Sequence, residues 1–191
     1  MVVPAWLDPP LEPEVIPIRL DPGGAFGTGA HPTTELCLKV LERHLKPGTA
    51  VLDFGTGTGI LAIAAAKLGA GPCLALDIDP EAVRVARANA ALNGVAEKVR
   101  VEQGSLAEIL AGRWGVSQSP FVVANILANV IVGFFEQGLA RAVTPGGWLV
   151  LSGILRAQTP EIRARLQWDG LELLAQEQQE DWVCLIARRA V

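Results

Sequence analysis

Residues 51–59 have the sequence VLDFGTGTG. An apolar strand leads into a turn with glycines at positions 55, 57 and 59, and the turn opens a helix; we call residues 55–59 the glycine turn. Glycines of this kind let a ligand approach the backbone closely. In open parallel sheets, ligands bind beyond the carboxyl ends of the strands, where the strand order reverses, and this turn follows the first strand of the core. The stretch therefore predicts an α/β fold with a nucleotide-like ligand at the turn.

Short apolar or β-branched runs alternate with helical patterns along the rest of the chain. The predicted core strands cover residues 50–54, 73–77, 99–103, 121–124 and 148–152. The predicted helices cover residues 32–45, 58–68, 80–93, 127–143 and 160–167, with a turn at 144–147. Two final strands, 171–176 and 182–187, are joined by polar residues 177–181 in a hairpin-like ending. Together these elements predict a three-layer, Rossmann-like α/β fold whose mostly parallel seven-stranded sheet has an antiparallel last strand.

Composition limits the class of protein. The chain has 191 residues, of which 50% are hydrophobic, which is enough to bury one core without disulfide bonds. The net charge of -4 does not provide the basic patch that nucleic-acid backbones require, although a basic protein could still bind. Three scattered cysteines and two histidines predict neither a disulfide framework nor a metal site. With no membrane-spanning run and no targeting segment evident, we expect a cytoplasmic protein.

The first 14 residues differ in composition from the rest. Four prolines lie at positions 4, 9, 10 and 13, and each lacks an amide donor. We therefore expect residues 1–14 to be an extended arm or linker and residues 15–191 to be the folded domain, with a short strand at 15–20.

An acidic residue ends the strand after the glycine turn. Asp77 follows Leu74-Ala75-Leu76, and an acid about 20 residues beyond a glycine turn can accept both hydrogen bonds from a ribose diol. We therefore predict that Asp77 binds ribose. Asp79 stands directly before Pro80, where we expect it to cap the next helix.

The spacing of the glycines favours one kind of nucleotide. A dinucleotide fingerprint requires G-x-G-x-x-G, but Ile60 occupies the position of its third glycine and Asp53 precedes the turn. An acid at this place suits a cation better than a pyrophosphate. S-adenosylmethionine carries an amino group and a sulfonium but no phosphate, so the pattern favours a methyltransferase over a dehydrogenase. Ser105 and Leu106, which follow the strand at 99–103, would then border the adenine.

Two longer motifs resemble a known family. The pair DFGTGTG at 53–59 and ALDIDP at 75–80 resembles the class I methyltransferases. The stretch GAFGTGAHPTT at 24–34, together with NIL at 125–127, resembles the ribosomal protein L11 methyltransferases over nearly the whole chain. The eleven-residue stretch is the more specific element, since many methyltransferases with unrelated substrates share DxGxGxG.

The resemblance implies transfer of methyl groups to the lysine side chains and the amino terminus of a ribosomal protein. It also implies that Thr34, Gly55, Asp77 and Asn125 contact S-adenosylmethionine. Members of the family usually carry an additional N-terminal recognition domain, whereas here a proline-rich arm stands in front. The chain is therefore expected to be either a catalytic fragment or a stand-alone relative with another protein substrate.

The glycine-rich loop, residues 24–31, and the two threonines after it suit a cofactor site. Phe26 offers an apolar face, and the hydroxyls of Thr28, Thr33 and Thr34 can bind polar atoms. Thr33 and Thr34 could instead start the helix after the proline. His31 could contact substrate or cap the loop.

Asn125 ends the strand at 121–124 and is the main candidate for orienting the acceptor amine. An ordinary helix cap is the alternative. Because the reference pKa of lysine is about 10.4, the amine must lose a proton before it attacks. No certain general base is evident, and His31 is a weak candidate. The sequence NILA lacks the Asn-Pro-Pro-aromatic pattern, which argues against DNA adenine or glutamine methylation.

The sequence thus predicts an amine-directed protein methyltransferase that uses S-adenosylmethionine and no metal. The alternatives are a methyltransferase for another protein or a small amine, and a non-catalytic domain that binds the cofactor. The candidate catalytic residues are Asn125 and His31. The predicted cofactor-binding residues are Phe26, Thr28, Thr33, Thr34, Asp53, Gly55, Thr56, Gly57, Asp77, Ile78, Ser105, Leu106 and Asn125.

Overall fold

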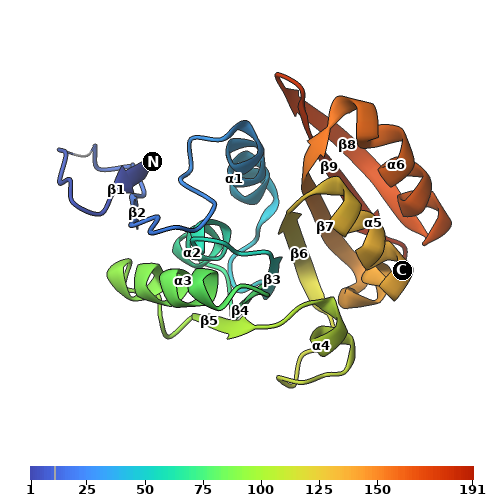
Figure 1. The fold of residues 1–191 in the computed structure, drawn as a ribbon, viewed down its shortest axis with the longest axis horizontal. Helices are drawn as coiled ribbons and strands as arrows, with labels where there is room; N and C mark the ends of the chain where they lie inside the picture. The colour runs from blue at the N-terminus through green and yellow to red at the C-terminus, as the bar shows by residue number, and fades with distance from the viewer. Residues whose placement is uncertain (11) are drawn as a thin grey trace.

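A seven-stranded sheet runs through the computed structural model, which describes residues 1–10 and 12–191 (Figure 1). Its strands are β3 (Val51–Phe54), β4 (Cys73–Asp77), β5 (Val99–Gln103), β6 (Ser119–Asn125), β7 (Val143–Leu155), β8 (Leu171–Gln179) and β9 (Trp182–Arg189). Two short strands, β1 (Val2–Pro4) and β2 (Ile18–Leu20), form a separate two-stranded sheet. The seven-stranded sheet has the order β5-β4-β3-β6-β7-β9-β8. Strands β3 to β7 run parallel, and β9 is antiparallel to both of its neighbours. The predicted sheet is confirmed.

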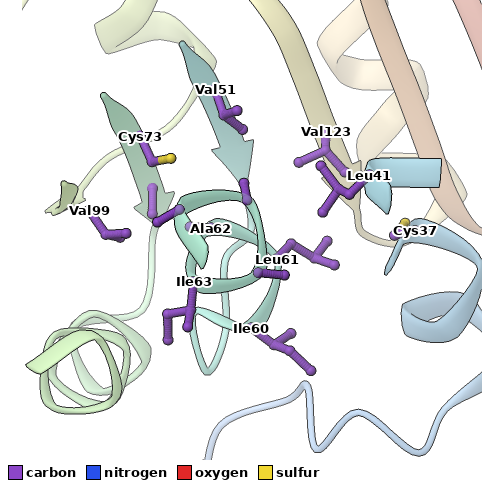
Figure 2. Packing of buried hydrophobic residues seen from close by; sticks show 14 of the residues in the cluster. Cys37, Leu41, Val51, Ile60, Leu61, Ala62, Ile63, Cys73, Val99 and Val123 are labelled. Carbon is purple, nitrogen blue, oxygen red and sulfur yellow. The ribbon is translucent and has the colours of Figure 1, made fainter. Parts of the chain in front are cut away.

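Helices cover both faces of the sheet. They are α1 (Pro32–His44), α2 (Ile60–Lys67), α3 (Pro80–Leu92), α4 (Leu106–Leu110), α5 (Ala128–Gln137) and α6 (Thr159–Trp168), with short 3-10 helices η1 (Leu139–Ala142) and η2 (Arg156–Gln158). Side chains alternate across a strand, so Val51 of β3 joins the core under α1, α2 and α3, whereas Leu52 joins the core under α4, α5 and α6. Figure 2 shows part of the first core, with Leu41 of α1 and Ile63 of α2. This is the predicted three-layer arrangement.

One predicted helix is divided in two. The segment 127–143 was expected to be continuous, but Gly138 has a φ of 95° and separates α5 from η1. Glycine adopts this left-handed angle without steric cost. The predicted turn at 144–147 also lies inside β7, because Ser119 already pairs with Val143 before the register shifts. The break at Gly138 was therefore missed, and the residues predicted as a turn belong to a strand.

The last strand lies inside the sheet, between β7 and β8. Gln179 pairs directly with Trp182, so the hairpin turn is limited to residues 180–181. The predicted connection over residues 177–181 is therefore too long. Residues 177–179 belong to β8, an edge strand that exposes many of its polar side chains and so resembles a loop in sequence.

The first residues of the predicted arm pair with the domain. β1 forms a parallel pair with β2, and the Ala5 amide donates to the Leu20 carbonyl at 2.8 Å. The start of the predicted arm is thus paired with β2. Leu11, which the predicted arm over residues 1–14 also includes, lies outside the described residues. A boundary after residue 14 stays a prediction.

Strand β2 is shorter than the predicted strand over residues 15–20. Pro17 precedes it and has no amide to donate to a ladder. The side chain of Asn93, at the end of α3, binds the backbone of Arg19 in β2 in the way that a neighbouring strand would. Its Oδ1 accepts from the Arg19 amide at 2.9 Å, and its Nδ2 donates to the Arg19 carbonyl at 2.6 Å. The N-terminal segment is therefore joined to the helix layer.

Asn89 of α3 links two segments that lead to the functional site. Its side chain is buried, with 1% exposed. Its Nδ2 donates to the carbonyls of Thr58 at 2.9 Å and Asp21 at 3.0 Å, and its Oδ1 accepts from the Asp21 amide at 2.9 Å. The glycine turn and the segment before the glycine-rich loop are thereby held to one helix.

Replacing Asn89 with leucine is expected to lower the free energy of unfolding by about 2–4 kcal/mol, because buried backbone groups lose their partners. Urea denaturation followed by circular dichroism measures this. Asn129→Leu is the matched control, since Asn129 lies at an exposed position of α5. Equal losses in the two variants would contradict the role given to Asn89.

Candidate functional site

A cleft of about 550 Å³ opens at the carboxyl ends of β3, β4, β5 and β6. Strands β4 and β5 lie on one side of β3, and β6 and β7 lie on the other, so the cleft sits where the strand order reverses. It is lined by Gly24, Ala25, Phe26, Phe54, Gly55, Gly57, Asp77, Ile78, Asp79, Ala82, Gly104, Ser105, Asn125, Ile126, Leu127, Val130, Phe134 and Gly153. The larger hollow of about 900 Å³ between α6 and β8 lies away from the glycine turn.

Asp77 ends β4 and lines the cleft. Its Oδ2 accepts from the Gly57 amide at 2.9 Å, and its Oδ1 accepts from the Asp79 amide at 3.1 Å. Two backbone donors thus orient the carboxylate, while each oxygen keeps further acceptor capacity for a ligand diol. The side chain of Asp79 accepts from the Glu81 amide at 2.9 Å, which confirms its predicted role as the cap of α3.

The glycine turn and the glycine-rich loop contact each other directly. The Thr58 amide donates to the Phe26 carbonyl at 2.9 Å, and the Thr58 hydroxyl donates to the Gly27 carbonyl at 2.7 Å. Gly57 has a φ of 55°, and a Cβ at this position would collide with the Phe26 carbonyl oxygen. Two motifs that are separate in the sequence therefore form one wall of the cleft.

Residues of the glycine-rich loop have different surroundings. Phe26 lines the cleft with 59% of its surface exposed. Thr28 instead lines a second hollow of about 400 Å³, together with Val2 and Trp6. The structure thus brings Phe26 to the cleft as predicted but does not bring Thr28 there.

His31 and Thr33 begin helix α1. Nδ1 of His31 lies 2.8 Å from the Thr33 hydroxyl and accepts from the Thr33 amide at 3.4 Å, so His31 caps the helix. Its ring packs edge-on between Phe26 and Trp182, with centroid distances of 5.6 and 4.9 Å. Neither His31 nor Thr33 lines the cleft: Thr33 lies in the first turn of α1, as its helix-start alternative predicts, whereas His31 caps this helix and not the loop.

Asn125 ends β6 and lines the cleft. Its Nδ2 donates to the Thr34 hydroxyl at 3.3 Å, and Thr34 is fully buried behind it. The capping alternative for Asn125 is wrong, because α5 begins at Ala128 and Leu127 occupies the cap position. The amide nitrogen is thus engaged, which leaves the amide oxygen as an acceptor.

Some of the predicted residues that follow β4 and β5 line the cleft and one does not. Ile78 lines the cleft and is 73% exposed, and Ser105 lines it as well. Leu106 is the first residue of α4, and its side chain is fully buried in the core. The structure therefore brings two of these three residues to the cleft.

The side chains of Asp53 and Thr56 are buried and do not line the cleft. The Thr56 hydroxyl donates to Oδ2 of Asp53 at 2.6 Å, and Oδ1 has no hydrogen-bond partner among the described residues. Burial raises the pKa of Asp53 to about 7, against the effect of the Thr56 hydrogen bond. The expectation that Asp53 complements a cationic ligand directly therefore needs correction. Asp77 and Asp79 are the acids that face the cleft.

We expect Asp53 to make the stability of the fold depend on pH. Its pKa is raised on folding, so the folded state binds a proton more tightly than the unfolded state, and the contribution to stability is lost as the pH rises from about 4 to about 7. The total is on the order of 4 kcal/mol. Asp53→Asn keeps an acceptor for Thr56 and removes the titration. Denaturant unfolding at pH 5 and pH 7.5 should show that the free energy of unfolding of the wild type falls between these pH values, and that of the variant does not. Equal falls in the two proteins would refute the role of Asp53.

Several cleft residues were not found from the sequence. Helix α5 and the segment before it contribute Ile126, Leu127, Val130 and Phe134. The apolar residues at 126 and 127 directly after Asn125 were the available signal. Gly153 of β7, with a φ of 83°, lies against the Ile126 carbonyl, which leaves no room for a Cβ.

The cleft combines two carboxylates with apolar walls. Among the described residues that line it, Asp77 and Asp79 are the titratable ones, and no lysine or arginine is present. Carboxylates repel a pyrophosphate but accept hydrogen bonds from hydroxyl groups and favour cations. The arrangement suits a nucleoside with free ribose hydroxyls and a positively charged substituent.

The sheet order and the cleft define a Rossmann-like fold of the class I methyltransferase type. A family model described as ribosomal protein L11 methyltransferase (PrmA) matches residues 1–190. The chain belongs to the ribosomal protein L11 methyltransferase family, as its motifs predict.

Individual relatives agree with this assignment. The chain is 47% identical over 188 residues to the ribosomal protein L11 methyltransferase of Pelotomaculum thermopropionicum, and the match covers 98% of this chain and 59% of that protein. A crystal structure of ribosomal protein L11 methylase from Lactobacillus delbrueckii subsp. bulgaricus matches with a TM-score of 0.87 and 36% identity, covering 100% of this chain and 94% of that one.

A more distant structure shows the fold alone. An RNA methyltransferase from Salinibacter ruber, solved in complex with S-adenosyl-L-homocysteine, has a TM-score of 0.63 and 23% identity, and the match covers 83% of this chain and 91% of that one.

The chain spans about three-fifths of the length of the curated relatives that it matches. In the part of the chain that the structure describes, no helix has the length and apolar character needed to cross a bilayer.

Proposed function

We propose that this chain is the catalytic domain of an S-adenosylmethionine-dependent N-methyltransferase that modifies amines of a ribosomal protein of the L11 type. The observation that carries the proposal is the position of the Asp77 carboxylate, which two backbone amides hold at the wall of the cleft beside the glycine turn. The folded domain that we propose covers residues 15–191, with residues 1–14 as an arm.

The residues of the cleft suit the parts of this cofactor. Asp77 would accept hydrogen bonds from the ribose hydroxyls. Ile78 and Ser105 on one side and Leu127 on the other would contact the adenine. Gly55 and Gly57 let the backbone approach the ligand, and Phe26 covers it from the glycine-rich loop. Thr34 would act through Asn125, which it contacts.

The carboxylates of the cleft would also favour the positive charge of the cofactor. When bound, S-adenosylmethionine would supply the methyl group of its sulfonium: the new bond joins the amine nitrogen to the methyl carbon, the C–S bond breaks in line with it, and the thioether S-adenosylhomocysteine is the leaving group. We propose Asp77 and Asp79, which line the cleft, in place of Asp53 as the acids that would favour this charge, since Asp53 is buried and does not line the cleft.

Asn125 is the residue that we propose to orient the acceptor amine. Its amide oxygen is free of the bond to Thr34 and can accept a hydrogen bond from the amine, which directs the nitrogen lone pair. Because a lysine amine has a reference pKa of about 10.4, it must release a proton before attack. His31 already holds the start of α1, so we propose that water takes this proton.

The proposed substrate is a basic protein, and the net charge of -4 favours such a partner over direct contact with nucleic acid. Methylation of a ribosomal protein would take place in the cytoplasm, the location that we propose.

Incubating the chain with methyl-labelled cofactor and purified ribosomal protein L11 tests the proposal. We expect label on amines of the ribosomal protein, and no label with Asp77→Ala. Label on another protein or on a small amine of a cell lysate would refute the substrate. Binding of the cofactor with no transfer to any amine would refute the catalytic assignment.

A further inference from the structure

One short stretch of backbone separates the cleft from a neighbouring hollow. Gly104 and Ser105 line both the cleft and this hollow of about 760 Å³, which lies on the other side of the stretch. The Gly104 amide donates to the Asp77 carbonyl at 2.9 Å, which fixes the stretch beside β4. A shift of this stretch would therefore change the width of the cleft.

The indole of Trp114 packs directly against Gly104 from the side of the hollow. A Cβ on Gly104 would lie 2.5 Å from Cη2 and 3.3 Å from Cζ2 of this ring. Gly104 does not have the left-handed backbone angle that favours glycine elsewhere in the chain. A glycine is thus needed here because of the indole and not because of the backbone conformation.

The indole is itself held in place. Trp114 is partly buried against the core under α4, α5 and α6, and the Arg113 guanidinium lies over its ring at 5.4 Å from the centroid. The carboxylate of Glu108 accepts a hydrogen bond from the Ser105 amide at 2.8 Å, and the backbone carbonyl of Glu108 accepts one from the Arg113 amide at 3.0 Å. Residues 105 and 113, at the two ends of the segment around α4, are therefore joined through Glu108, and this places the indole of Trp114 beside Gly104.

We propose that Trp114 is a positioning residue for the cofactor. It does not line the cleft but supports the Gly104–Ser105 backbone from behind and thereby sets the width of the adenine end. This inference rests on the proposed function, because it assigns that end of the cleft to adenine.

Calorimetric titration with S-adenosyl-L-homocysteine tests it through binding alone. We expect Trp114→Ala to weaken binding about tenfold and Trp114→Phe to keep most of the affinity. Gly104→Ala should also weaken binding about tenfold, because the new methyl group collides with the ring. In the Trp114→Ala background the same Gly104→Ala change should have little further effect, since contacting residues are coupled.

Trp168→Ala is the matched control, because Trp168 is 88% exposed at the end of α6. If Trp114→Ala binds as tightly as Trp168→Ala, or if the two substitutions multiply in the double variant, the positioning role is wrong. Should Trp114→Ala fail to fold, the affinities of Gly104→Ala and Trp114→Phe are compared with that of Trp168→Ala instead. A Gly104→Ala chain that binds as tightly as this control would show that the positioning role is wrong. Absence of binding by the wild-type chain would overturn the proposed function, and this inference with it.

Discussion

Replacing Asp77 with alanine is expected to weaken binding of S-adenosyl-L-homocysteine by roughly a hundredfold or more. Two hydrogen bonds from the ribose hydroxyls to a carboxylate are lost, at about 1.5 kcal/mol or more each. The backbone amides of Gly57 and Asp79 also lose the carboxylate that accepts their hydrogen bonds. Calorimetry measures the dissociation constant, and thermal unfolding shows whether the variant remains folded.

Glu81→Ala is the control for Asp77→Ala. Glu81 stands four residues further on, at the start of α3, and it pairs with Arg84 at the surface and does not line the cleft. We expect the affinity of this variant to equal that of the wild type. A folded Asp77→Ala chain that binds as tightly as Glu81→Ala would show that the ligand does not use the carboxylate of β4.

Replacing Gly57 with alanine is expected to weaken binding of the same ligand by more than about thirtyfold, which corresponds to about 2 kcal/mol. The new Cβ would collide with the Phe26 carbonyl oxygen, so the glycine-rich loop must move away and the hydrogen bond that the Thr58 amide donates to this oxygen must break. Because the left-handed angle costs about 1–2 kcal/mol for alanine, the free energy of unfolding should fall as well.

Gly94→Ala separates these two effects. Gly94 has a φ of 69°, but no atom lies within 4 Å of the place of its Cβ. We expect backbone strain to lower the free energy of unfolding of Gly94→Ala by an amount comparable to its effect in Gly57→Ala, and we expect the affinity for the ligand to stay unchanged. If both glycine variants lose affinity equally, the contact between the glycine turn and the glycine-rich loop is not what shapes the cleft.

The parts of the fold that follow from local sequence were predictable. Strands β4 and β5 were predicted with their observed bounds, because apolar or alternating runs end there in polar residues. The place of Asp77 also follows locally, since a residue at the end of a parallel strand faces the edge where ligands bind. A glycine turn and an acid at the end of the next strand were therefore enough to locate the cleft.

Other features depend on contacts between distant segments. Asp53 and Thr56 belong to the motif but face the interior, and the motif alone does not tell which of its side chains face the ligand. Leu127, which precedes α5, and Val130 of α5 line the cleft because of the way this helix packs against the sheet, which local sequence does not determine. The contact of Trp114 with Gly104 joins residues on either side of α4, and no motif marks it.

The sheet edge illustrates the same limit. Residues 177–179 are polar although they lie in edge strand β8, where Glu177 pairs with Arg43 and Gln179 donates to Glu35 of α1, so composition alone assigns them to a loop. Their pairing with β9 depends on the return of the last strand into the interior of the sheet.

The crystal structure of the chain with S-adenosyl-L-homocysteine tests the central claim most directly. We predict one ligand in the cleft between the glycine turn and Ile126, with its ribose hydroxyls at hydrogen-bond distance from the Asp77 carboxylate. Ligand density in the hollow between α6 and β8, or a ribose that faces away from Asp77, would contradict the account.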